Sequence, residues 1–202
     1  GSNSLTLSMG NNVANTDISA SGAISGVTTL TLQNVGGTAT LSADVDVTTL
    51  SVDNTVANVA FTGNGSSVTN AVSFANDGTL TLGTSGGTQT YNGGLTTTSV
   101  GGTVTVNGTL ATSNDAVVLG AVTLGSNTTI DTNATDTDGD ITIAAVTGGN
   151  NTLTLTTENN IANADITASG AISGVTTLTL ASVGGTATLS ADVDVTTLSV
   201  DN

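Results

Sequence analysis

The stretch VGGTATLSADVDVTTLSVDN occupies Val35–Asn54 and occurs again, unchanged, at Val183–Asn202. The identity extends beyond this stretch, because residues 3–54 and 151–202, which lie 148 positions apart, agree at 43 of 52 positions. We interpret the chain as part of a tandem array with a period of 148 residues. It contains one period and about a third of the next.

The repeated stretch alternates Thr or Ser with Val, Leu or Ala, which is the period-two pattern of a strand with one wet and one dry face. Similar runs recur along the chain, among them Thr28–Leu32, Thr103–Val106 and Ile141–Val146. Gly-Gly, Asn-Gly and Asp-Gly pairs separate them, as expected for turns. No segment shows a convincing helical period, so the sequence predicts an all-β chain.

Among all-β architectures the sequence favours a parallel β-solenoid. A packed sandwich core normally uses aromatic residues, and this chain has one Tyr, two Phe and no Trp. Three strands of ~5 residues joined by turns of ~2 residues need about 21 residues per coil. The whole chain, residues 1–202, would then be one continuous solenoid segment of about nine to ten coils.

Seven coils of this size would nearly fill the 148-residue period. We therefore expect a whole number of coils in each period, which would place each copy on the same face as the original. Asp44 and Asp192 should then lie on nearly the same face, ~34 Å apart along the axis.

Two segments favour the alternative of tandem antiparallel β-sandwich repeats. TVTVNGTL at Thr103–Leu110 is typical of a two-residue hairpin, since Asn-Gly suits a type I′ turn. FANDGTLTL at Phe74–Leu82 is similar. Both also fit solenoid corners, where residues with positive φ are useful.

The charge of the chain is one-sided, with 15 acidic residues and no Lys, Arg or His. We expect no nucleic-acid partner, because nucleic acids bind through Lys and Arg. We also expect no membrane insertion, since no run of about 18 apolar residues occurs. Counter-ions or divalent cations must balance the charge.

The composition argues against an enzyme and against a cofactor. Acid–base and nucleophilic catalysis usually recruit His, Cys, Lys or paired carboxylates, and only carboxylates are present. A carboxylate pair can cleave a glycoside, but the chain lacks basic side chains to hold acidic sugars and aromatic platforms to stack them. We predict no catalytic residues.

The densest polar cluster is DTNATDTDGD at residues 131–140. It supplies Asp131, Asp136, Asp138 and Asp140, and calcium accepts six to eight hard oxygen ligands of this kind. The spacing is not that of an EF-hand, because Ala134 and Ala145 would occupy ligand positions. Two interpretations stay open: a solvated acidic turn, or a calcium site formed by these four residues.

Two further patterns have both a structural and a binding interpretation. Asp44 and Asp46 share a face of their strand, with Val45 and Val47 facing inward. They form either an outward polar face that discourages edge pairing or a metal site. Thr-x-Thr pairs, such as Thr79/Thr81, are ordinary strand residues or parts of an ice-binding Thr ladder.

The chain resembles the repetitive shafts of filamentous-haemagglutinin-type bacterial surface proteins. The resemblance lies in GDITI at Gly139–Ile143, TLTL at Thr152–Leu155, the ISGVTTLTL segments at Ile24–Leu32 and Ile172–Leu180, and the composition. It implies a secreted, right-handed parallel β-helix that works as a stalk or fibre.

These observations predict a structural protein that forms an extracellular or cell-surface filament, stalk or sheath. Its partner would be itself, through head-to-tail or lateral association, with divalent cations as a further possibility. The alternative is a binding module, either a calcium-dependent adhesin or an ice-binding Thr-ladder solenoid.

Overall fold

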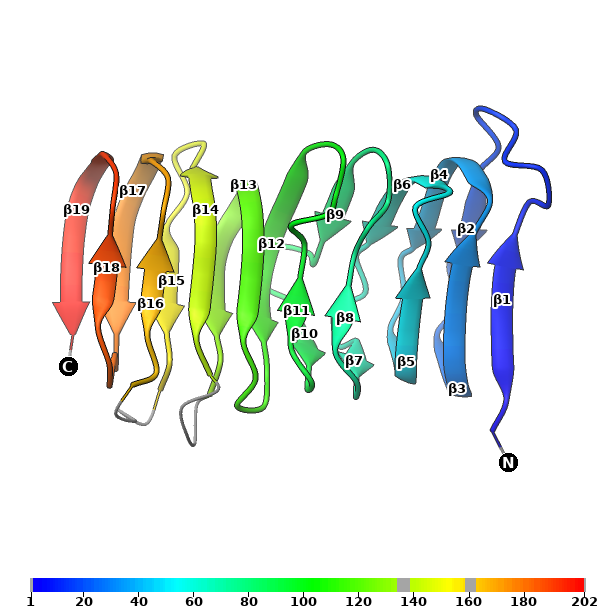
Figure 1. Cartoon of the computed structure of the whole chain (residues 1–202), viewed down its shortest axis with the longest axis horizontal. Helices are drawn as coiled ribbons and strands as arrows, with labels where there is room; N and C mark the ends of the chain where they lie inside the picture. Colours follow the sequence, from blue (N-terminus) through cyan, green and yellow to red (C-terminus); the bar gives the residue numbers. More distant parts are fainter. Residues whose placement is uncertain (1, 134–138, 159–162, 202) are drawn as a thin grey trace.

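The chain is a parallel β-solenoid of about nine turns. A computed structural model describes residues 2–133, 139–158 and 163–201. The strands stand side by side along one axis, and the two termini lie at opposite ends (Figure 1). No helix long and apolar enough to cross a membrane occurs in the described part of the chain.

The described residues form nineteen strands, all paired in parallel where they meet. They are β1 (Ser4–Ser8), β2 (Ile18–Ala20), β3 (Ile24–Gln33), β4 (Val35–Leu41), β5 (Val45–Val52), β6 (Val56–Phe61), β7 (Ser67–Val68), β8 (Val72–Ser73), β9 (Leu80–Leu82), β10 (Thr88–Tyr91), β11 (Leu95–Thr96), β12 (Val104–Ala111), β13 (Val117–Asp131), β14 (Ile141–Thr147), β15 (Leu153–Thr156), β16 (Ile166–Ala168), β17 (Ile172–Ala181), β18 (Ala187–Leu189) and β19 (Val193–Asp201).

Each coil has three sides, which we name after one inward-pointing leucine on each. The Leu80 face has an unbroken row of paired residues, at Ile18, Ala39, Val59, Leu80, Val104, Val122, Val146, Ile172 and Val193. The Leu110 face includes the row Gln89, Leu110, Ile130, Leu155, Leu180 and Val200. The Leu95 face includes the row Val72, Leu95, Val117, Ile141, Ile166 and Ala187.

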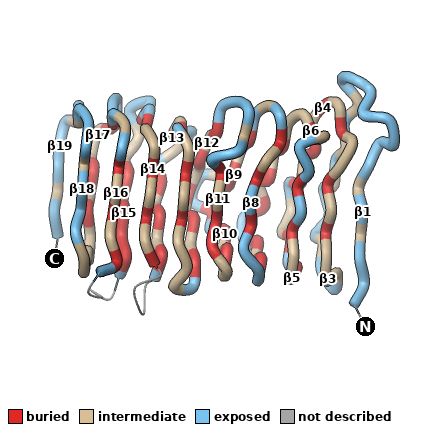
Figure 2. The backbone as a smooth tube through the Cα atoms, in the orientation of Figure 1, coloured by how far each residue is buried: buried red, intermediate tan, exposed pale blue. Residues whose placement is uncertain are grey.

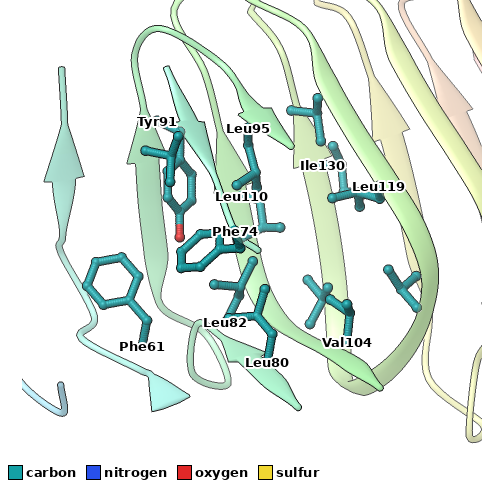
Figure 3. Packing of buried hydrophobic residues seen from close by; sticks show 14 of the residues in the cluster. Phe61, Phe74, Leu80, Leu82, Tyr91, Leu95, Val104, Leu110, Leu119 and Ile130 are labelled. Atoms are coloured by element: carbon teal, nitrogen blue, oxygen red, sulfur yellow. The ribbon is translucent and has the colours of Figure 1, made fainter. Parts of the chain in front are cut away.

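The core is the narrow space between the three faces, and the alternating sequence fills it. Along β12 buried and half-buried residues alternate strictly, so its Val and Leu side chains point inward while its Thr side chains point outward. Figure 2 shows this alternation over the middle of the stack and more exposed coils at both ends. The three aromatic side chains, Phe61, Phe74 and Tyr91, are all fully buried (Figure 3).

The antiparallel alternative is wrong for Asn107-Gly108. These residues lie inside β12, which pairs in parallel with β9 before them and with β13 on both sides of them. Gly108 has φ +65°, and the register between β12 and β13 shifts at this point. The Asn-Gly pair therefore turns the strand through a corner, where positive φ is required for the same reason as in a hairpin.

The expectation of a whole number of coils per period is also wrong. Ile166, the copy of Ile18, lies on the Leu95 face, whereas Ile18 lies on the Leu80 face. Likewise, Asp44 and its copy Asp192 lie beside different faces. Asp44 precedes Val45, which pairs with Ile24 at the start of the Leu110 face, whereas Asp192 precedes Val193 on the Leu80 face. The reason is that coils differ in length: successive residues of the Leu80 row are 18 to 26 positions apart.

Candidate functional site

On two of the faces most outward-pointing side chains carry a hydroxyl group. On the Leu80 face the paired residues are Ser19, Thr40, Ala60, Thr81, Thr105, Thr123, Thr147, Ser173 and Asp194. On the Leu110 face they are Thr88, Thr109, Thr129, Thr154, Thr179 and Ser199. Neighbouring residues of a row repeat at the coil spacing of ~4.8 Å, so hydroxyl groups form much of the polar surface of the rod, between the carboxylates that carry its negative charge.

The Thr-x-Thr pairs do not gather on one face. Thr79/Thr81 belongs to the Leu80 face and Thr88/Thr90 to the Leu110 face, and Ala60 interrupts the row on the Leu80 face. The ice-binding alternative stays a prediction, now with defined rows on which it can be tested.

Asp131 and Asp140 flank the loop for which calcium was predicted. Asp131 ends β13, and its Oδ1 accepts a hydrogen bond from the Asn133 N–H at 2.8 Å. Asp140 Oδ1 accepts from the Asp165 N–H of the next coil at 2.8 Å. The Thr132 hydroxyl donates to the Gly139 carbonyl at 2.6 Å.

The pKa of Asp131 lies above that of an ordinary carboxyl. Partial burial raises the pKa of Asp131, the Asn133 N–H opposes this shift, and the negative charge of Glu158 adds to it. Asp136 and Asp138 lie outside the described residues. Within the described ranges, no three Asp, Glu, His or Cys side chains are grouped in a way that could hold a metal ion, so calcium binding remains a prediction.

A second use of acidic and amide side chains was not predicted from the sequence. Asp17 Oδ1 accepts from the Thr38 N–H at 2.7 Å, and its copy Asp165 accepts from the Thr186 N–H at 2.6 Å. Asn58 accepts in the same way from Thr79 at 2.9 Å. In each case a Gly precedes the Thr, which leaves room for the carboxylate or amide oxygen. An Asp or Asn 21 residues before the Thr of a Gly-Thr pair is the sequence signal.

Asp44 and Asp46 follow the predicted pattern. Val45 and Val47 are buried, and Asp46 is exposed between them. Asp44 Oδ1 accepts from the Gly65 N–H of the next coil at 2.8 Å. The structure therefore uses Asp44 to connect coils, and its position gives no support to a metal site at this pair.

A shallow groove of about 500 Å³ lies over the Leu95 face. Its floor is formed by small residues such as Gly93, Gly94 and Ala116, and Asp115 and Asp140 lie along it. Asp140 is already engaged with the Asp165 N–H. The hydroxyl side chains of Ser73 and Thr96 also line the groove, and the sequence supplies no Lys, Arg, His or Cys beside the carboxylates.

The two ends of the stack are the other distinctive surface. Leu198 is 50% and Val200 is 66% exposed on β19. Their counterparts in the first copy, Leu50 and Val52 on β5, are 4% and 6% exposed. The two strands have the same sequence from Val45 to Val52 and from Val193 to Val200. The difference arises because the following coil packs against β5, whereas β19 is the last strand described.

No protein family model, curated protein or solved structure matches this chain.

Proposed function

We propose that this protein is a structural element of an extracellular or cell-surface filament, stalk or sheath, built by head-to-tail stacking of β-coils. The fold is compatible with such a role and with the repetitive shafts that the sequence resembles. In a stack of this kind each coil contacts only its neighbours, so the rod can be extended by adding coils at its ends.

The observation that carries the proposal is the exposure of Leu198 and Val200. Within one molecule, the same two residue types are nearly buried where another coil follows and half exposed or more where none follows. Burying a Leu or Val side chain stabilises by about 1.5–3 kcal/mol. The open strand edge also carries unpaired backbone groups, which attract another strand.

A further coil of the same repeat fits this edge, whether it follows in the same chain or belongs to the β1 end of a second copy. That end is also an open edge, because β1 pairs only with β3 among the described strands, and its Leu5 and Leu7 are partly buried. Charge works against association, since every molecule carries −15. Assembly should therefore require salt or divalent cations, which screen or bridge the carboxylates.

Sedimentation velocity and negative-stain electron microscopy test this proposal. With rising protein concentration at high ionic strength, the wild type is expected to form rods one solenoid wide. Val200→Lys, which places a charge on the open apolar edge, is expected to remain monomeric. Thr197→Lys adds the same charge at an exposed position of β19 that pairs with Thr177, and it should assemble like the wild type.

The proposal would be wrong if the wild type stayed monomeric under these conditions. Equal assembly of Val200→Lys and Thr197→Lys would also contradict it, because the open edge would then not be the contact.

A further inference from the structure

The two copies of the repeat fold in the same way. In the first copy Leu5 pairs with Leu30 and Ile18 with Ala39. In the second, Leu153 pairs with Leu178 and Ile166 with Ala187, each 148 positions later. Backbone conformations agree as well: φ is +70° at Gly26 and +65° at Gly174, and +52° at Asn34 and +50° at Ser182.

The second copy nevertheless lies on different faces. The row that begins at Ile18 continues through six coils to Val146 and then reaches Ile172, which is the copy of Ile24. The copy of Ile18 itself, Ile166, pairs with Ile141 on the Leu95 face. From Ile18 to Ile166 the chain therefore completes six coils and two of the three sides of the next.

The fold tolerates this displacement because the three faces are chemically alike. Within the repeated segments, each face has inner residues of the types Val, Leu, Ile or Ala and outer residues rich in Thr, and the buried Gln89 of the Leu110 face lies outside these segments. Phe61, Phe74 and Tyr91, which would distinguish one region of the core, lie outside the repeated segments 3–54 and 151–202. A copied segment consequently meets an equivalent surface on whichever face it arrives.

We propose that, in a chain with further copies of this period, each copy turns by one face relative to the one before it, so that the repeat forms a three-fold screw. This inference rests on the proposed function as a stacked filament. Three periods make about twenty coils, and with ~4.8 Å per coil a given surface returns to the same face after about 96 Å. A period of seven whole coils would instead repeat it every ~34 Å.

The turn determines how the filament meets its surroundings. A lateral partner that recognises one copy finds its binding surface on a given side of the rod only once in three copies. The carboxylates of the repeated segment, such as Asp17 and its copy Asp165, are distributed around the rod. Charge repulsion and cation bridging between neighbouring filaments would then act in three directions.

Distances between spin labels in the dilute, monomeric 202-residue protein test the turn without requiring filaments. The chain has no Cys, so two introduced cysteines define each labelled pair. Thr96 and Thr105 are half-buried outward residues of one coil, on the Leu95 and Leu80 faces respectively. Each is paired in turn with a label at Ser19 or at its copy, Thr167.

The two copies should give opposite rankings. Ser19→Cys is expected nearer to Thr105→Cys, which lies in its own row four coils away at ~19 Å. Thr167→Cys is expected nearer to Thr96→Cys, which lies three coils away at ~14 Å. If both labels were nearer to Thr105→Cys, the copies would share a face and the three-fold screw would be refuted. That result would leave end-to-end assembly, measured separately, unaffected.

Discussion

Tyr91 makes the alkaline stability of this protein depend on a single side chain. The chain contains no Lys, Arg, His or Cys and only one Tyr. Above the range of the α-amino group near pH ~8, no other side chain titrates. Tyr91 is fully buried, and its hydroxyl donates to Gln89 Oε1 at 2.9 Å.

Burial raises the pKa of Tyr91 well above its ordinary value of 10.0. The folded protein thus keeps the phenol protonated at a pH at which the unfolded chain loses the proton. The stabilisation is fully present below about pH 10 and is lost as pH rises from there toward the folded-state pKa. The free energy of unfolding should fall by about 1.4 kcal/mol for each pH unit above about 10.

Tyr91→Phe removes the ionisable phenol and lowers the stability of the protein by an amount that does not depend on pH. Tyr91 Oη is the donor to the buried Gln89 Oε1, so the substitution leaves this acceptor without that hydrogen bond, while Gln89 Nε2 still donates to the Phe61 carbonyl at 2.8 Å and to the Gly63 carbonyl at 3.1 Å. Leaving a buried acceptor unpaired costs about 1–3 kcal/mol. The variant should be less stable than the wild type at pH 7, and the two stability curves should meet near pH ~11–12.

Chemical denaturation followed by circular dichroism at several pH values measures these curves, and near-ultraviolet absorbance reports the tyrosinate directly. The absorbance of the folded wild type should stay flat until the protein unfolds. Ionisation of Tyr91 with a midpoint near pH ~10, while the circular dichroism remains native, would refute the reasoning.

Three further predictions concern the corners and the acidic loop. Gly101→Ala places a Cβ where it overlaps the Asp77 carbonyl oxygen, so thermal denaturation should show a free energy of unfolding lower by about 1–3 kcal/mol. Gly22→Ala is the control and should change stability little, because its Cβ would meet no atom within 4 Å. Asp131→Asn should raise the melting temperature at pH 7 but not at pH ~3. The raised pKa of Asp131 means that its charged form destabilises the folded state, and this cost exists only above the pKa of an ordinary carboxyl, near ~4. An equal change in melting temperature at both pH values would contradict this prediction. Calcium should raise the melting temperature of the wild type, a chelator should reverse this rise, and Asp131→Asn should not respond. If calcium leaves the melting curve of the wild type unchanged, the interpretation as a solvated acidic turn is the one that stands.

The solenoid could be predicted because the pattern that defines each strand involves only consecutive residues. Alternation of Thr with Val or Leu predicts which side chains enter the core, and Val45 and Val47 are buried as expected. The Asn107-Gly108 corner could not be distinguished from a hairpin, since both require positive φ and only the partner strands differ. Those partners lie 18 to 24 positions away in the chain, as for Leu80 relative to Val104 and Leu124 relative to Val106.

The number of coils in one 148-residue period could not be predicted from the sequence pattern. An estimate of about 21 residues per coil assumes turns of uniform length, but the coil from Val146 to Ile172 has 26 residues and the one from Val104 to Val122 has 18. The links from Asp17 to Thr38 and from Asp44 to Gly65 were missed for a related reason. They join residues one coil apart, and the coil length must be known before the pair can be recognised.

The equivalence of the three faces also bears on how such a chain can change in length. If copies had to occupy the same face, only duplications or deletions of complete coils would preserve the hydrogen-bonded stack. Here a copy displaced by one side still finds apolar neighbours inside and strand partners beside it. The smallest tolerated increment is therefore one side of a coil, roughly seven residues if a coil of about 21 residues is divided equally. Recombination between repeats can then yield rods of many lengths without requiring the crossover to fall in register with the coil.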